Sequence, residues 1–202
     1  MREKIHTLDR ETINELKEEF YAIDLETTGS DPAEDDIIEV GIVRFHNLIP
    51  KERYSTLVQT EKTIPDKVTQ MTGITNQHLL NGIYMQEDIF YAIYMAMPRV
   101  RDAIFCGHRA DFDIGFLEKN NEKYISEPKT FRFIDTMEQA QKAMLNVPNY
   151  RLDAVAEYYN LPIGHRHRAL DDAETSGLIL AELVKRADKI LKFNEELEEM
   201  LK

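Results

Sequence analysis

The stretch Phe20-Tyr-Ala-Ile-Asp-Leu-Glu26 predicts a β-strand, and Thr27-Thr-Gly-Ser-Asp-Pro32 breaks it. Asp24 and Glu26 are separated by one residue, so their side chains project from the same face of the strand. Two carboxylates side by side on a buried strand are unfavourable unless a cation or hydrogen-bond donors neutralise them. Such a pair also occurs on ordinary solvated strands, so the pair alone does not decide between a cation-binding site and a solvent-exposed strand.

The residues that follow this strand favour a binding site. Thr27, Thr28 and Gly29 are small, so the backbone amides of this loop can approach a phosphate or a sugar hydroxyl.

The rest of the chain predicts an α/β fold with a mixed sheet covered by helices. A short helix over 9–19, with Asp9 as N-cap and Ile13 and Leu16 on one face, precedes the first strand. The hydrophobic pattern then predicts strands over 37–45, 54–59, 103–107 and 131–135, the first of them antiparallel to strand 20–26, and helices over 86–101, 111–121, 137–145, 152–159 and 171–185.

Length and composition favour one domain with a small appendage. The chain has 202 residues, of which 43% are hydrophobic, enough for one full core. We expect a domain over 1–187, with a motif-bearing core at about 20–184, and an acidic helical tail over 188–202. We expect the tail to lie on the domain surface; self-association and a linker remnant are the alternatives.

Charge and cysteine content narrow the function. A net charge of −12 argues against binding a long polyanion through a broad basic surface, so any nucleic-acid contact must be local. Cys106 is the sole cysteine, which excludes an intrachain disulfide and a multi-cysteine zinc site. We expect a cytoplasmic protein without a membrane partner, because no apolar run is long enough to span a bilayer and the first residues do not form a secretory signal.

A second acidic position lies in His108-Arg-Ala-Asp-Phe-Asp113-Ile-Gly-Phe-Leu117, directly after a predicted strand. Asp113 falls in the first turn of the predicted helix, which we expect to begin at an aspartate cap, near the carboxyl edge of the sheet, where α/β sites collect. Taken alone, it is also an ordinary first-turn aspartate favourable to the helix dipole, an interpretation that Asp111 fits well.

The third segment, His167-Arg-Ala-Leu-Asp-Asp172-Ala, places a loop histidine just before a carboxylate at the start of a long helix. This spacing lets the imidazole approach a metal-bound water while Asp172 binds the metal. His165 offers a competing interpretation, a His-x-His transition-metal site, but no cysteine or third nearby histidine supports it.

Together, in this order, the three segments resemble the histidine variant of the DEDD-type 3′→5′ exonucleases, a family that includes the proofreading epsilon subunit of bacterial DNA polymerase III. The resemblance covers about 20–184, and Ile64-Pro65, Thr72-Gly-Ile-Thr75 and Ile134-Asp-Thr136 also fit it. It implies a ribonuclease H-like fold, two Mg²⁺ or Mn²⁺ ions and a general base. The implied metal ligands are Asp24, Glu26, Asp113 and Asp172, and the implied base is His167.

The resemblance further implies hydrolysis from the 3′ end of single-stranded DNA, with release of nucleoside 5′-monophosphates and a DNA polymerase as a candidate partner. Arg109 departs from the family pattern, which often has Asn there. RNA trimming by the same chemistry and a non-catalytic module that holds a 3′ end or a polymerase are the alternatives. The expected substrate-binding residues are Leu25, Thr27, Thr28, Gly29, His108, Arg109 and Phe112.

Overall fold

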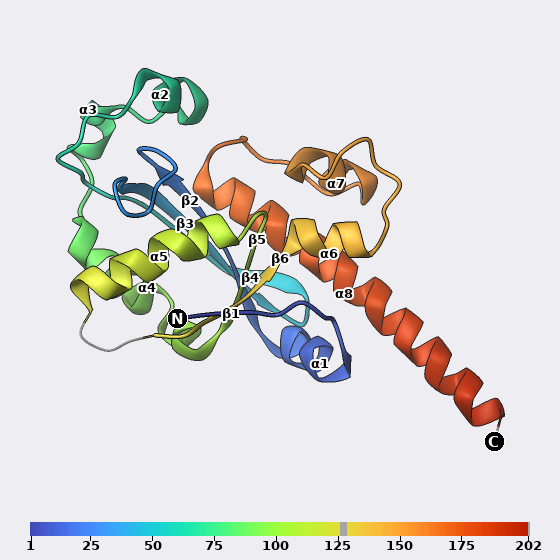
Figure 1. The fold of residues 1–202 in the computed structure, drawn as a ribbon. Coiled ribbons are helices and arrows are strands. Elements are labelled where there is room, and N and C mark those ends of the chain that lie inside the picture. Colours follow the sequence, from blue (N-terminus) through green and yellow to red (C-terminus); the bar gives the residue numbers. More distant parts are fainter. Residues whose placement is uncertain (126–128, 202) are drawn as a thin grey trace.

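A mixed sheet of six strands forms the centre of the computed structural model, which describes residues 1–125 and 129–201 (Figure 1). The strand order is β1-β6-β5-β2-β3-β4; β1, β6, β5 and β2 run parallel, and β3 is antiparallel to β2 and β4. The strands are β1 (Arg2–Lys4), β2 (Phe20–Thr27), β3 (Ile37–His46), β4 (Ile49–Leu57), β5 (Ile104–Gly107) and β6 (Phe131–Asp135). The predicted mixed sheet is confirmed.

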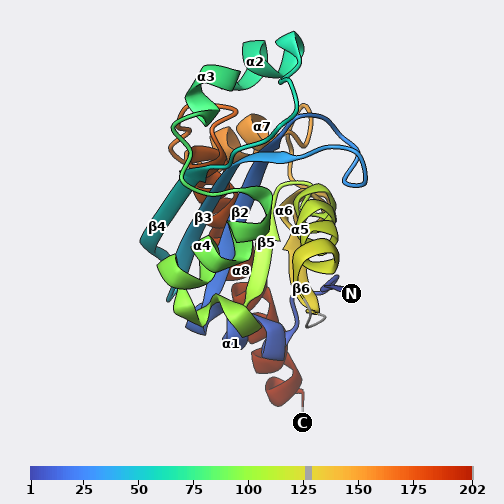
Figure 2. The same cartoon turned by 90° about the vertical axis from the view of Figure 1, so that its left-hand side faces the viewer.

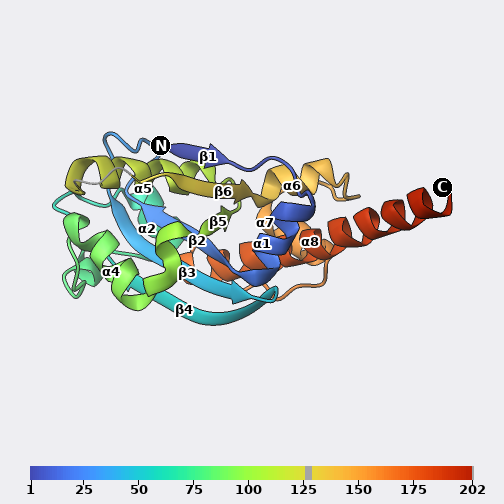
Figure 3. The same ribbon diagram turned by 90° about the horizontal axis from the view of Figure 1, so that it is seen from below.

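Helices cover both faces of this sheet (Figures 2 and 3). Helices α4 (Ile89–Ala96) and α5 (Asp111–Tyr124) lie on one face, and α1 (Arg10–Glu18) and α8 (Ala169–Met200) lie on the other. The remaining helices are α6 (Thr136–Lys142) and α7 (Leu152–Tyr158), which pack against α8, and α2 (Asp66–Thr72) and α3 (Asn76–Leu79), which lie beyond one end of the sheet. No helix in the described ranges is both long and apolar enough to cross a membrane.

Strand β2 contributes to both hydrophobic cores. Tyr21 and Ile23 belong to the core beneath α4 and α5, whereas Phe20 and Ala22 belong to the core beneath α8. Because successive side chains of a strand point to opposite faces, Asp24 continues the series on the α8 side. The strand is therefore fixed on both faces by apolar packing just before its acidic residues begin.

The first predicted helix is confirmed with its cap. The Asp9 side chain accepts a hydrogen bond from the backbone N–H of Thr12 at 2.8 Å, and Ile13 and Leu16 are fully buried.

Two predicted elements have different bounds. Strand β4 begins at Ile49 rather than at residue 54, because Asn47 and Leu48 adopt left-handed φ angles of 54° and 60° and form a tight turn. This edge strand is largely exposed, so its sequence lacks hydrophobic alternation. The helix predicted over 86–101 is instead three pieces, a 3₁₀ turn at Gln86–Asp88, helix α4 and a second 3₁₀ turn at Pro98–Asp102, because Pro98 has no amide hydrogen with which to continue a helix.

Smaller differences affect the other helices. Within the described chain α5 begins after Ala110 without a side-chain cap, so the predicted aspartate cap is wrong, and Asp111 forms an ion pair with Lys4 at 2.5 Å. Helix α6 ends at Lys142, three residues before the predicted end. Strand β1 was not predicted, because its three residues are polar.

The helix predicted over 171–185 and the acidic tail form one continuous helix, α8, of 32 residues. Asp188 pairs with Arg10 at 2.6 Å and Lys17 at 2.7 Å, which ties this part of α8 to α1. Leu191 packs against the core, whereas Phe193 is exposed and the last turns project from the domain (Figure 1).

Helix α8 lies close to the sheet because Gly177 has no side chain. A Cβ atom there would lie 2.2 Å from Cε2 of Phe45, whose ring is held by stacking on Phe20 at 4.7 Å. We expect Gly177→Ala to lower the free energy of unfolding by about 1–3 kcal/mol, as overpacking of a core does. Urea denaturation would measure the change.

Gly115→Ala is the matched control, because Gly115 is also helical but its Cβ would meet other atoms only at 3.4 Å. Alanine should leave stability there unchanged or raise it by up to about 1 kcal/mol. Equal effects of the two substitutions would contradict the close contact of α8 with Phe45.

Candidate active site

A cleft of about 1190 Å³ brings the predicted acidic residues and the histidine together. It lies between the end of β2, the start of α5, the start of α8 and the 149–153 segment. The predicted residues that line it are Asp24, Leu25, Glu26, His108, Arg109, Phe112, Asp113, His167 and Asp172. Thr27, Thr28 and Gly29 are not among the lining residues.

Strand β3 leaves room for α8 beside Asp24. Gly41 is the residue paired with Asp24 in the sheet, and a Cβ atom on Gly41 would lie 2.1 Å from the carbonyl carbon of Ala169. The backbone at the start of α8 therefore occupies the space that a side chain on β3 would otherwise fill. This close approach places Asp172, in the first turn of α8, next to the carboxylates of β2.

An ion pair with a buried carboxylate fixes the loop that leads into α8. Glu39, only 1% exposed, is the neighbour of Glu26 on β3. Its carboxylate accepts hydrogen bonds from Nη2 of Arg168 at 2.6 Å, from Nε of Arg168 at 3.2 Å and from the backbone N–H of Ala169 at 3.0 Å. His167, the preceding residue, adopts a left-handed φ of 62°, so this anchored loop holds the histidine in a backbone conformation that is uncommon outside glycine.

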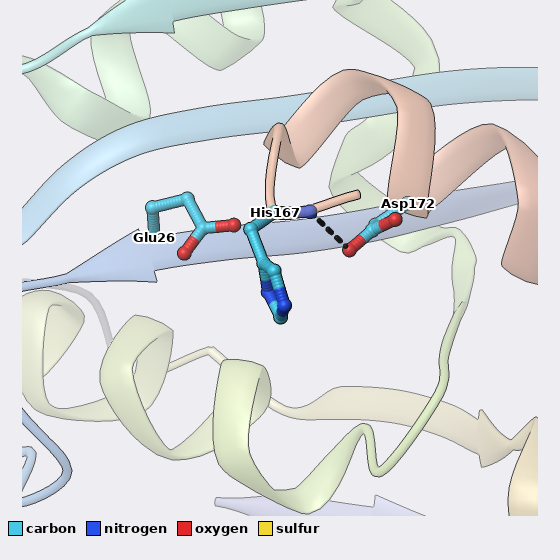
Figure 4. Close-up of side chains that lie close together, drawn as sticks. All are labelled: Glu26, His167 and Asp172. Carbon is cyan, nitrogen blue, oxygen red and sulfur yellow. Dashed lines mark hydrogen bonds between the residues drawn. The ribbon is translucent and has the colours of Figure 1, made fainter. Parts of the chain in front are cut away.

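Glu26, His167 and Asp172 form the tightest group in the cleft (Figure 4). One ligand atom from each lies within 4.8 Å of the other two. Oδ2 of Asp172 accepts a hydrogen bond from the backbone N–H of His167 at 3.1 Å, and Oδ1 of Asp172 accepts one from Nη1 of Arg166 at 2.6 Å. This arrangement can hold a cation through His167 as well as through the two carboxylates.

Asp113 is tied to β2 from the opposite side of the cleft. The residue is 3% exposed, and its Oδ1 accepts a hydrogen bond from the backbone N–H of Leu25 at 2.9 Å. Helix α5 thus orients its first-turn carboxylate by a contact with the strand that carries Asp24 and Glu26.

Burial raises the pKa values of all four carboxyl groups, and repulsion from neighbouring carboxylates adds to the rise at Asp24, Glu26 and Asp113. Burial, Asp113, Glu26 and Asp172 raise the pKa of Asp24 well above its usual value. Burial, followed by the charge of Asp172, raises the pKa of Glu26 to about 8, and burial raises the pKa of Asp113 to about 8 against the opposing hydrogen bond from Leu25. Burial also raises the pKa of Asp172.

This donor set fits divalent cations. Its ligands are carboxylate oxygens, which hard cations such as Mg²⁺ prefer. The raised pKa values of Asp24 and Glu26 show that nearby positive charge does not offset the burial and repulsion of these carboxylates. A bound cation would remove the repulsion that raises their pKa values.

The loop of Thr27, Thr28 and Gly29 is held by its own contacts. Oγ1 of Thr28 donates to Asp35 at 3.2 Å and accepts from the backbone N–H of Asp36 at 3.0 Å. A Cβ on Gly29 would lie 2.3 Å from the Asp35 carboxylate. In the structure these small residues close the loop on itself.

His108 connects three segments at the wall of the cleft. Its Nε2 donates to the Tyr150 carbonyl at 2.7 Å, and its Nδ1 contacts Oγ1 of Thr136 at 2.9 Å. Burial lowers the pKa of His108 and so favours the neutral ring, and the Thr136 hydroxyl also lies 3.2 Å from the carbonyl oxygen of Gly107. The contacts of His108 thus position the segment that carries Tyr150.

Sequence reasoning missed several residues of the cleft, above all Arg166, Tyr150 and Arg151. The position of Arg166 directly before His167 could have marked it as a residue of the site, whereas no sequence motif surrounds Tyr150 and Arg151. His165 does not belong to the group of possible metal ligands found in the described residues, which joins His167 to two carboxylates instead.

Known proteins resemble this chain in sequence. The 3′-5′ exonuclease DinG of Staphylococcus epidermidis is 30% identical over 175 residues, which cover 85% of this chain and 18% of that protein. A PolC-type DNA polymerase III of Thermotoga maritima is 33% identical over 171 residues, which cover 85% of this chain and 12% of that protein. The chain thus spans less than a fifth of these relatives.

Solved structures with a similar fold and a matching family model are also exonucleases. Exonuclease I of E. coli, solved with a dT13 oligonucleotide, superposes with a TM-score of 0.74 at 16% identity, over 87% of this chain and 43% of that one. Exonuclease X, solved with 5′ overhanging duplex DNA, gives a TM-score of 0.61 at 21% identity, over 83% of this chain and 92% of that one. The model of the RNase_T family, described as "Exonuclease", matches residues 21–180. The chain is therefore a member of the RNase_T exonuclease family.

Proposed function

We propose that this chain is a cation-dependent 3′→5′ exonuclease that shortens single-stranded DNA and releases nucleoside 5′-monophosphates. The observation that carries the proposal is the convergence of four carboxylates and His167 on one open cleft. Family membership supports the reaction class, and the polymerase and exonuclease relatives support DNA as the substrate.

Asp24, Glu26, Asp113 and Asp172 would hold the cations, which we propose are two Mg²⁺ or Mn²⁺ ions. When bound, such ions lower the pKa of water and offset charge on the phosphoryl and leaving oxygens. The hard oxygen donors and the raised pKa of Glu26 support this assignment.

His167 would take a proton from the attacking water. The water oxygen bonds to phosphorus and the bond from phosphorus to the 3′-oxygen breaks. The 3′-oxygen takes up a proton from solvent, so the shortened strand ends in a 3′-hydroxyl and the terminal nucleotide leaves with the phosphate at its 5′ position. The anchor between Arg168 and Glu39 holds the imidazole beside Glu26 and Asp172 while the proton moves. An imidazole suits this role because its unperturbed pKa is near 6.5.

The walls of the cleft suit a short single strand. Phe112 is 36% exposed and lines the cleft, so its ring offers a stacking surface for a base. The Arg109 and Arg151 side chains also line the cleft and form no ion pair with the described acidic residues, so both are available for phosphate contacts. We propose that Thr27, Thr28 and Gly29 act indirectly, by shaping the loop after the backbone of Leu25.

A DNA polymerase is the partner that the relatives suggest. PolC-type DNA polymerase III proteins contain a segment similar to this chain, but the chain spans only 12% of the Thermotoga maritima relative. We propose association with a polymerase on this basis alone.

Replacing Asp24 by Asn should abolish cation-dependent digestion, because the amide cannot supply the negative ligand that neutralises a cation. A time course on 5′-labelled single-stranded DNA and RNA of matched sequence, with Mg²⁺, Mn²⁺ or chelator, would measure this loss and rank the two sugars. Undiminished activity of the variant would overturn the assignment, and faster digestion of RNA would favour RNA trimming.

His167→Asn tests the role of the imidazole. Asparagine tolerates the left-handed backbone of residue 167, so the loop should keep its conformation. We expect the rate to fall by about 10²–10⁴-fold, as for loss of a general base, while calorimetric titration shows unchanged affinity for Mg²⁺. A matching loss of Mg²⁺ affinity would make His167 a ligand rather than the base.

The raised pKa values predict the pH dependence of stability. The folded protein keeps protons on Glu26 and Asp113 up to pH values near 8, whereas the unfolded chain releases them near their usual values of 4.5 and 3.8. Stability in chelator should therefore fall as pH rises from about 4 to 8. Mg²⁺ should raise the melting temperature more at pH 8 than at pH 5.5, because protons compete with the cation.

Thermal melts with Mg²⁺ and with chelator across this range would test the dependence, with Glu26→Gln as the control. The variant has one fewer carboxyl group with a raised pKa, so its melting temperature in chelator should vary less with pH. A metal-free protein that becomes more stable between pH 5 and 8 would contradict the sign.

A further inference from the structure

Arg166 occupies an unusual place in the cleft. It lies in the loop before α8, between His165 and His167, and its side chain is 35% exposed. Its neighbour in the loop, Arg168, is committed to the buried carboxylate of Glu39. Arg166 instead reaches the catalytic cleft, where its Nη1 lies 2.6 Å from Oδ1 of Asp172.

This ion pair occupies one oxygen of a carboxylate that a cation would need. Oδ2 of Asp172 is already bonded to the backbone N–H of His167 at 3.1 Å, so both oxygens of the carboxylate are engaged. The backbone bond is fixed by the fold, whereas the arginine side chain can move. A cation that binds Asp172 through Oδ1 therefore meets the positive guanidinium at the same oxygen, and the two charges compete for it.

The charge of Arg166 acts on the whole cluster. Burial and the neighbouring carboxylates raise the pKa values of Asp24 and Glu26, and Arg166 opposes the rise at both. Arg166 thus supplies part of the positive charge that the cluster needs when cations are absent.

We propose that Arg166 is a built-in counterion of Asp172 that gives way to the divalent cation and then binds a phosphate of the substrate strand. The inference rests on the proposed nuclease function. A guanidinium released from Asp172 remains in the cleft, and its forked donors match two phosphate oxygens. Cation binding would in this way prepare the phosphate contact, and the nucleic acid would in turn favour the cation-bound state.

The test compares Arg166→Gln with Arg10→Gln, a matched control outside the cleft. Arg10 also binds an aspartate, with Nη1 at 2.6 Å from Oδ1 of Asp188. Calorimetric titration of each protein with Mg²⁺ alone should show about tenfold tighter binding for Arg166→Gln and no change for Arg10→Gln, since only the first removes a competitor for Asp172.

Binding of a fluorescent oligo-dT strand should change in the opposite direction. In a His167→Asn background with saturating Mg²⁺, which preserves the strand, Arg166→Gln should weaken binding about tenfold or more. Arg166→Lys keeps the positive charge but cannot donate to two phosphate oxygens at once as a guanidinium does. The Mg²⁺ affinity of this variant should therefore stay near that of the parent, while its affinity for the strand falls. Opposite shifts in Arg166→Gln are the signature, because a merely structural role would weaken both.

Three results would overturn the inference: weaker Mg²⁺ binding in Arg166→Gln, which would make Arg166 a brace for Asp172; unchanged Mg²⁺ binding; or unchanged strand binding. The proposed function fails separately, if the parent protein neither binds Mg²⁺ nor shortens DNA. A parent that does both, with Arg166→Gln identical to it, would contradict the counterion role alone.

Discussion

Repulsion among carboxylates crowded at one end of β2 is the constraint to which the rest of this structure responds. Asp24 and Glu26 share a strand face, and Asp113 and Asp172 are brought to them by α5 and α8. Their raised pKa values show that the fold holds these groups together against their electrostatic preference. It can do so because β2 is packed on both faces by apolar side chains. Rigid support of this kind is what a site requires if it is to bind cations in a fixed arrangement.

Sequence reasoning found candidate residues that the structure brings to one cleft, because they lie at short spacings in the chain. The separation of Asp24 from Glu26 and of His167 from Asp172 can be interpreted from local geometry alone, and the order of the three segments then carried the family resemblance. The supports of the site are long-range. Arg168 binds Glu39 across 129 positions of sequence, and nothing near either residue marks the pair. The same holds for Gly41, whose role depends on the approach of α8. The fold was predicted well where apolar residues run continuously through a buried strand, as in β2, and poorly on the exposed edge strand β4, where few residues are apolar.

The distribution of charge reconciles an acidic chain with a nucleic-acid substrate. The chain has a net charge of −12, yet three arginines line the cleft beside the carboxylates: Arg109, Arg151 and Arg166. These arginines place positive charge beside the carboxylates, where hydrolysis is proposed to occur. Such a site favours contact with a few nucleotides at a chain end over binding along a duplex.

The continuity of α8 has a practical meaning for anyone who shortens this protein. A cut after residue 187, where composition suggests that the domain ends, would fall inside a helix and remove Asp188, the acceptor for both Arg10 and Lys17. A cut before Glu195 would remove the second partner of Arg10, at 2.8 Å. A fragment designed for crystallisation should therefore run at least to Glu195, beyond which no described ion pair or core contact ties the helix to the domain. The end of the folded unit is set by what α1 holds, not by where the sequence turns acidic.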